Sequence, residues 1–291
     1  MKTVLFYSFK GGVGRTQTLL NVAKYLTQNL NKKICMVDFD IYAPGLSYLS
    51  KYGKNENQEF FLKYLVDLFE ENEKKDIFAD KIADNLSLIP AYNMQSIKPY
   101  HKLLTDLSQF LYSIKDSADK EVDNLSTVAD NIFNIIKQDI ESTGEYDYIF
   151  FDARTGITEV SDILFSQDLD LKIIVSSYNN QNINGTNEIL NILPKTKVKK
   201  HNVLRVLSPK PVENREILRE IYINANLDNN LDLRDKFDWN GTLEVHYENE
   251  VVVNDADVWD IVKDKKDNDY KNDIIEMAEK INNILGNELV L

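Results

Sequence analysis

A short glycine-rich stretch near the start of the chain, Phe9-Lys10-Gly11-Gly12-Val13-Gly14-Arg15-Thr16, has the composition of a phosphate-binding loop. Glycines let backbone N–H groups approach phosphate oxygens closely, and a helix beginning here adds the positive end of its dipole. The general pattern is Gly-x-x-x-x-Gly-Lys-Ser/Thr. Gly14 and Thr16 match it, whereas Ser8 or a neighbour replaces the first glycine and Arg15 replaces the lysine.

Acidic residues follow two apolar segments farther along the chain. Asp38 and Asp40 end the run 34–40, and Asp152 ends the run 146–152. Because ligands of a parallel sheet bind outside the carboxyl ends of its strands, we expect these acids and the glycine loop to meet at one edge. A single acid after a buried strand often only caps the next turn. Two acidic strand ends that converge with a phosphate loop at a third strand end favour a site for a nucleotide and Mg²⁺.

The elements that must position these residues alternate between strands and helices. Apolar runs of strand length, separated by segments with helical apolar spacing, indicate parallel pairing. The sequence therefore predicts an α/β fold, a doubly wound and mostly parallel sheet flanked by helices, in a single domain over 1–291. The predicted strands are 3–8, 34–40, 86–90, 146–152, 171–176, 203–208 and 243–247. One predicted helix follows the glycine loop and ends near residue 30. The others cover 60–69, 102–114, 125–140, 187–193, 213–223 and 273–285.

The segment of approximately 52–145 differs in character from the rest. It is predicted to be a helical insertion interrupted by the short strand at 86–90. It shows no repeat and no catalytic constellation, so its aromatic and leucine-rich helix faces are expected to be core or a surface for a protein partner.

Composition indicates a globular protein with an acidic surface. The chain has 291 residues, 43% of them hydrophobic, and a formal net charge of −13, which disfavours general affinity for nucleic acid. The single cysteine, Cys35, excludes an internal disulfide and a paired-cysteine metal centre. The chain begins with a strand rather than a basic, apolar leader, and no apolar run has the length of a membrane span. We expect a cytoplasmic protein.

The run Lys10-Gly11-Gly12-Val13-Gly14-Arg15-Thr16 resembles the deviant phosphate loop of the MinD/ParA family of ATPases, with arginine at the second lysine. Asp38-Phe39-Asp40, followed by Pro44-Gly45, is similar to the second acidic motif of that family. Asp152-Ala153-Arg154-Thr155-Gly156 resembles its Walker B strand and switch. Arginine in the loop resembles a KGGVGR subgroup, whose members often belong to larger bacterial signalling or conflict-related systems.

The resemblance implies a role for each residue of the site. Asp40 would position the attacking water, and Lys10 would reach across a dimer to the partner's nucleotide, as an arginine finger does. Mg²⁺ would be held by Thr16, Asp38 and Asp152, partly through water. The implied nucleotide-binding residues are Lys10, Gly11, Gly12, Val13, Gly14, Arg15, Thr16, Gln17 and Pro209, the last in the position of the adenine-contacting loop.

Arg15 sets the expected rate of the reaction. An arginine is a wider, planar fork than a lysine, yet it can neutralise phosphate oxygens in pairs. Its bulk is expected to displace the γ-phosphate from the geometry that in-line attack requires. The sequence therefore predicts ATP binding with slow hydrolysis.

The main functional hypothesis is an ATPase that dimerises around ATP and Mg²⁺ and regulates a partner protein. One alternative is a catalytically weak nucleotide-binding scaffold in a larger bacterial signalling or defence assembly. Another is DNA partitioning, for which Lys195, Lys197, Lys199, Lys200 and His201 form a basic cluster, although the acidic chain favours a solvated loop there. A dinucleotide fingerprint is excluded because Gln17 stands where its last glycine belongs.

Overall fold

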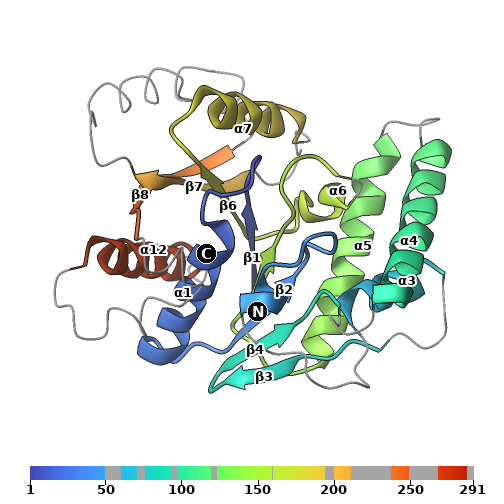
Figure 1. Ribbon diagram of the computed structural model, residues 1–291, viewed down its shortest axis with the longest axis horizontal. Coiled ribbons are helices and arrows are strands. Elements are labelled where there is room, and N and C mark those ends of the chain that lie inside the picture. Colours follow the sequence, from blue (N-terminus) through green and yellow to red (C-terminus); the bar gives the residue numbers. More distant parts are fainter. Residues whose placement is uncertain are drawn as a thin grey trace.

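The structure is a computed structural model that describes residues 1–49, 60–70, 76–92, 97–118, 123–158, 160–193, 200–210, 237–248 and 268–286. One eight-stranded sheet runs through these residues in the order β3-β4-β2-β5-β1-β6-β7-β8, with helices on both faces (Figure 1). The strands are β1 (Lys2–Tyr7), β2 (Ile34–Asp38), β3 (Asp80–Ala83), β4 (Leu86–Ile89), β5 (Tyr148–Asp152), β6 (Leu171–Ser176), β7 (His201–Lys210) and β8 (Phe237–His246).

All neighbouring strands of the sheet pair in parallel except the edge pair of β3 and β4. Parallel neighbours need crossover connections, which the helices provide. The helices are α1 (Arg15–Asn29), α2 (Leu46–Leu49), α3 (Phe61–Phe69), α4 (Ile97–Ala118), α5 (Asp123–Ser142), α6 (Ser161–Leu164), α7 (Asn180–Ile192) and α12 (Asp269–Gly286). The predicted doubly wound, mostly parallel sheet is confirmed.

The alternating side chains of the central strands divide the core into two layers. In β1, Leu5 and Tyr7 pack with α3, α4, α5 and α6, whereas Val4 and Phe6 pack with α1 and α12. Both faces of the strands are buried, so they are continuous apolar runs instead of alternating ones. Figure 1 shows α1 and α12 together on one side of β1 and α3, α4 and α5 on the other.

The segment predicted as a helical insertion contributes to the main sheet. Its predicted strand is β4, which pairs in parallel with β2. The sequence did not predict β3, a four-residue strand that adds an antiparallel edge beside β4. Of the helices in this segment, α3, α4 and α5 cover one face of the sheet through Phe61, Leu107 and Phe133.

Two helices begin earlier than predicted because asparagine side chains cap them. The side chain of Asn179 accepts a hydrogen bond from the backbone N–H of Asn182, so α7 starts at Asn180. Asn268 does the same for the N–H of Lys271 at the start of α12. Such caps satisfy N–H groups that have no partner within the helix.

Some predictions fall on residues that the structure leaves undescribed. The predicted helix at 213–223 and the lysines of 195–199 lie outside the described residues. Among the helices that are described, none has the length and apolarity to cross a bilayer.

Candidate functional site

The glycine loop joins the end of β1 to the start of α1, as the sequence predicts. Gly12 and Gly14 have φ angles of 78° and 77°. An L-residue in this left-handed region costs about 1–2 kcal/mol, which explains glycine at both positions. Helix α1 begins at Arg15, directly after Gly14, and has no side-chain cap at its N-terminus. Its first N–H groups are therefore available to an anion at the loop.

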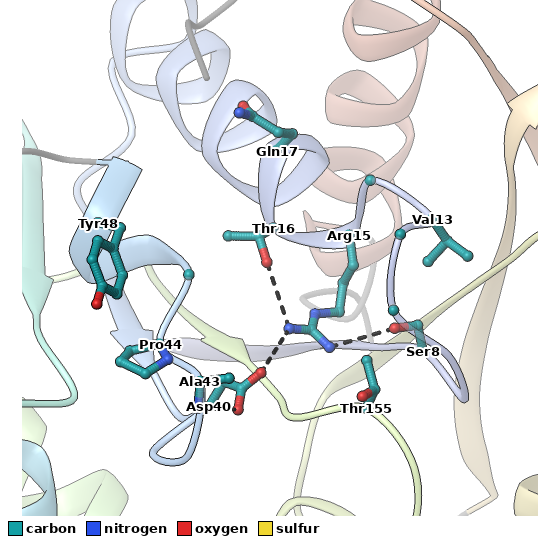
Figure 2. Close-up of a pocket in the computed structure, with 14 residues that line it drawn as sticks. Ser8, Val13, Arg15, Thr16, Gln17, Asp40, Ala43, Pro44, Tyr48 and Thr155 are labelled. Atoms are coloured by element: carbon teal, nitrogen blue, oxygen red, sulfur yellow. Dashed lines mark hydrogen bonds and ion pairs between the residues drawn. The ribbon is translucent and has the colours of Figure 1, made fainter. Parts of the chain in front are cut away.

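An open pocket of about 480 Å³ lies in front of the loop and the start of α1 (Figure 2). The loop after β2 forms its opposite wall. Gly45 allows this wall to approach closely, because a β-carbon there would lie 3.2 Å from Oγ1 and Cγ2 of Thr16. The pocket is lined by Ser8, Gly11, Gly12, Val13, Gly14, Arg15, Thr16, Gln17, Asp40, Ala43, Pro44, Gly45, Tyr48 and Thr155.

The guanidinium of Arg15 contacts two acids beside the pocket, Asp152 and Asp40. Its Nε lies 2.6 Å from Oδ1 of Asp152, and its Nη2 lies 3.6 Å from Oδ2 of Asp40. Nη1 donates to the hydroxyl of Ser8 at 3.4 Å, and Figure 2 shows the guanidinium between Ser8, Thr16 and Asp40. Burial alone would lower the pKa of Arg15, but its charge interaction and hydrogen bond with Asp152 raise it. The guanidinium is thus a buried cation held by carboxylates.

Thr16 and Asp152 are in direct contact. The Thr16 hydroxyl donates to Oδ2 of Asp152 at 2.8 Å, while Oδ1 of the same carboxylate takes the Nε–H of Arg15. Asp152 is fully buried. Its place follows from the register of the central strands, in which Asp152 of β5 lies opposite Asp38 of β2.

Asp38 is a buried acid with one satisfied oxygen. Its Oδ2 accepts hydrogen bonds from the backbone N–H of Ser47 at 2.8 Å and from the Ser47 hydroxyl at 2.7 Å. Burial, and then the charge of Asp152, raises the pKa of Asp38 to about 7, although the bonds from Ser47 act in the opposite direction. Ser47, which the sequence did not single out, is therefore the residue that fixes this carboxyl group.

Asp40 lies at the pocket wall, where a catalytic carboxylate could meet a ligand. Its Oδ1 accepts a hydrogen bond from the N–H of Ala43 at 3.2 Å, and its other oxygen faces Arg15. Burial raises the pKa of Asp40 despite the opposing charge of Arg15.

The donor set at the base of the pocket fits a hard divalent cation. Mg²⁺ prefers oxygen ligands and keeps several waters. The structure offers the Thr16 hydroxyl and the carboxylates of Asp38 and Asp152 on adjoining elements. Oδ1 of Asp38 is buried and has no hydrogen-bond partner among the described residues, which is the state of an oxygen that a bound ion or its water would satisfy.

Phe9 attaches the glycine loop to α7, a contact that the sequence did not reveal. A β-carbon on Gly185 would overlap the Phe9 ring, so the ring lies directly on the α7 backbone. The start of the loop is also tied to the segment after β5, because the Gly156 N–H donates to the carbonyl of Ser8 at 3.4 Å. Tyr7 adds a hydroxyl bond to the carbonyl of Gly156 at 2.9 Å.

Two residues expected at the nucleotide lie beside the pocket, not in its lining. Lys10 is partly exposed, and among the described residues its ammonium has no ion pair or hydrogen bond. Pro209 follows Ser208, whose hydroxyl would lie 3.4 Å from a β-carbon on Gly14. The carboxyl-terminal part of β7 therefore reaches the loop.

The sequence analysis did not identify three features of the site. They are Tyr48 in the pocket lining, the hydrogen bonds from Ser47 to Asp38 and the contact of Phe9 with Gly185. Tyr48 and Ser47 belong to the short helix α2, for which the sequence offers only the break at Pro44-Gly45 as a signal. Nothing near Gly185 in the sequence indicates its neighbour.

The parallel sheet, the glycine loop at its central strand and the acids at adjoining strand ends define a P-loop NTPase fold of the MinD/ParA type. Residues 1–206 match the AAA_31 family, described as an AAA domain, and the chain belongs to this family.

Individual relatives agree with this assignment. The chain is 38% identical to the virulence plasmid ParA family protein pGP5-D of Chlamydia trachomatis over 94 residues. This aligned region covers 31% of this chain and 33% of that protein. The chain thus spans about a third of the length of the curated relatives it matches.

Solved structures share the fold over nearly the whole chain. A variant of McdA from Cyanothece in complex with ATP has a TM-score of 0.62 and 16% identity, covering 97% of this chain and 96% of its own. The MinC:MinD cell division complex of Aquifex aeolicus includes a chain with a TM-score of 0.55 and 19% identity, again covering 97% and 96%. At these identities the likeness shows the fold alone.

Proposed function

We propose that the chain binds ATP and Mg²⁺ and acts as a nucleotide-dependent switch that dimerises and regulates a partner protein. The observation that carries this proposal is a cluster beside the glycine loop, in which Thr16 and Asp40 line the pocket and the fully buried Asp152 contacts Thr16 and lies opposite Asp38 in the sheet. McdA, which shares the fold, was solved with ATP, and this supports the choice of nucleotide.

The phosphates would be held mainly by the backbone. Residues Gly11 to Gln17, of the loop and the first turn of α1, line the pocket, and their N–H groups would donate to phosphate oxygens. Thr16, Asp38 and Asp152 would hold Mg²⁺, the acids partly through water. When bound, Mg²⁺ would neutralise charge on the phosphates. Pro209 would lie near the base, because Ser208 lies against Gly14.

Asp40 and Lys10 would act on the bound nucleotide. Asp40 reaches the pocket wall and would orient the attacking water. Lys10 is partly exposed without a partner among the described residues, so its ammonium is available to the nucleotide of a second copy. Such a cation supplied in trans can contribute about 10³–10⁵ in rate.

The position of Arg15 supports the proposal of slow hydrolysis. Its guanidinium is bound to Asp152 and Asp40 in the free chain, and a phosphate ligand would have to draw it away. This buried pair also supports a second candidate, a nucleotide-binding scaffold with weak catalysis in a larger assembly. The protein partner would then contact the helices of the 52–145 segment.

DNA partitioning is a third candidate, supported by the ParA family relative of the chlamydial virulence plasmid. It requires salt-sensitive DNA binding that weakens when Lys199 and Lys200 are neutralised. The net charge of −13 argues against it.

The experiment is calorimetric titration of the chain with ATP and ADP in Mg²⁺. We expect saturable binding of both, and a loss of about tenfold in Gly12→Ala, because alanine is strained at the φ of 78°. Gly286→Ala, at a position with no neighbour within 4 Å of a β-carbon, is the control for the substitution itself. Absence of binding by the folded wild type would overturn the proposal.

A further inference from the structure

Arg15 lines the pocket, but its guanidinium is held by the acids Asp152 and Asp40. Only 7% of the residue is exposed, and its Nε lies 2.6 Å from Asp152, closer than any other contact of the guanidinium. A loop cation aimed at phosphates would instead extend along the pocket. In the free chain, Arg15 is thus an internal counter-ion of Asp152 and Asp40.

The guanidinium also faces the hydroxyl expected to ligate a divalent cation. Nη2 of Arg15 is 3.5 Å from Oγ1 of Thr16 and 3.6 Å from Oδ2 of Asp40 (Figure 2). Mg²⁺ binds oxygens at about 2.0–2.1 Å and requires an octahedral shell of ligands and waters. The oxygens of Thr16, Asp40 and Asp152 that such an ion could use are already in contact with the guanidinium.

We propose that Arg15 and a divalent cation exclude one another from Asp152, so that the free chain binds no metal until a nucleotide draws the guanidinium onto its phosphates. The movement of the guanidinium onto phosphates rests on the proposed function. The exclusion of metal from Asp152 in the free chain does not depend on any nucleotide. Guanidinium groups bind phosphate oxygens in pairs, which gives Arg15 a competing partner once the pocket is filled.

The proposal predicts a fixed order of binding: phosphates first, divalent ion second. It also makes Arg15, and not the acids, the residue that decides whether metal alone is accepted. A lone acidic cluster would bind metal without nucleotide. Here Asp152 and Asp40 already share the guanidinium of Arg15 as a counter-ion.

Mn²⁺ is the probe, because its electron paramagnetic resonance signal reports bound and free ion directly. We expect no saturable Mn²⁺ binding by the nucleotide-free wild type, and binding of one ion per chain, at least about tenfold tighter, in Arg15→Ala. Adding Asp152→Asn to Arg15→Ala should remove that site. Equal Mn²⁺ affinity in wild type and Arg15→Ala, whether both bind or neither does, would overturn the proposal.

Arg154→Ala is the matched control. Arg154 is another arginine near these acids, but its guanidinium stacks on the ring of Tyr42 at 4.1 Å. Its removal changes the net charge equally and should leave the Mn²⁺ affinity of the free chain at the wild-type level. An increase like that of Arg15→Ala would mean that general charge, and not occupancy, controls metal binding.

Should Arg15→Ala fail to fold, thermal melting of the wild type keeps the proposal testable. Mn²⁺ alone should leave the melting temperature unchanged, whereas a non-hydrolysable ATP analogue in EDTA should raise it. Mn²⁺ added to that complex in excess over the EDTA should raise it further. A rise with Mn²⁺ alone contradicts the exclusion. If the analogue does not raise the melting temperature in either buffer, the proposed nucleotide function is contradicted. The effect of Mn²⁺ alone then still tests whether Arg15 excludes metal from the free chain.

Discussion

The ring of Phe9 lies directly on the backbone of Gly185, so the glycine loop rests on helix α7. These residues are far apart in the chain. The contact fixes the start of the loop from the side opposite α1. Position 185 lies in the interior of a helix, where alanine is normally preferred, but the Phe9 ring leaves no room for a β-carbon there.

Gly185→Ala should therefore destabilise the protein. Alanine gains up to about 1 kcal/mol of helix propensity, but overlap with the Phe9 ring costs typically about 1–3 kcal/mol, so the overlap wins. Urea denaturation measures the difference. The double variant Phe9→Ala with Gly185→Ala should recover the part of the loss due to overlap, and an unchanged loss in the double variant would show that Phe9 is not the cause.

Thr16→Ala should separate nucleotide binding from metal binding. The variant loses the hydroxyl that contacts Asp152 at 2.8 Å but keeps the backbone N–H groups of the loop. We expect ATP affinity in EDTA to stay within about twofold of wild type and the additional affinity from Mg²⁺ to disappear. Calorimetry in both buffers tests this, with Thr16→Ser as the variant that retains the effect.

The buried carboxyl group of Asp38 should make the metal-free chain less stable as the pH rises. Its pKa is raised to about 7 in the folded state, chiefly by burial. Between the unfolded value near 3.9 and this folded value the native state binds more protons than the unfolded state, so stability falls with increasing pH. The loss is complete above the folded pKa.

Asp38→Asn should remove this pH dependence. Asparagine can still accept the two hydrogen bonds from Ser47 and carries no charge. In EDTA, its melting temperature should exceed that of wild type at pH 8, with the difference shrinking toward pH 5. Parallel curves for the two proteins would mean that another group sets the pH dependence.

Lys10→Ala and Asp40→Ala should affect assembly in opposite directions. If Lys10 completes a second chain's site, Lys10→Ala will remain monomeric with ATP and Mg²⁺, whereas Asp40→Ala will bind ATP without hydrolysis and accumulate as the dimer. Light scattering after size exclusion gives the mass of each. If neither substitution alters the oligomeric state, the scaffold hypothesis is favoured over the switch.

The sequence by itself determined the features that depend on local patterns. Apolar runs flanked by glycines or acids predicted the strands, the loop before α1 and the strand ends that carry Asp38, Asp40 and Asp152. These predictions succeed because a buried parallel strand and a glycine loop each impose their composition on neighbouring residues. Once the sheet is parallel, its carboxyl ends meet at one edge.

Only the tertiary structure decided which partners these residues take. Arg15 reaches Asp152 across 137 positions of sequence, and no local pattern distinguishes a guanidinium aimed at phosphates from one held by acids. The same holds for Ser47 on Asp38 and for Phe9 on Gly185. Such contacts depend on strand register and on the space left between packed elements, which periodicity in the sequence does not encode.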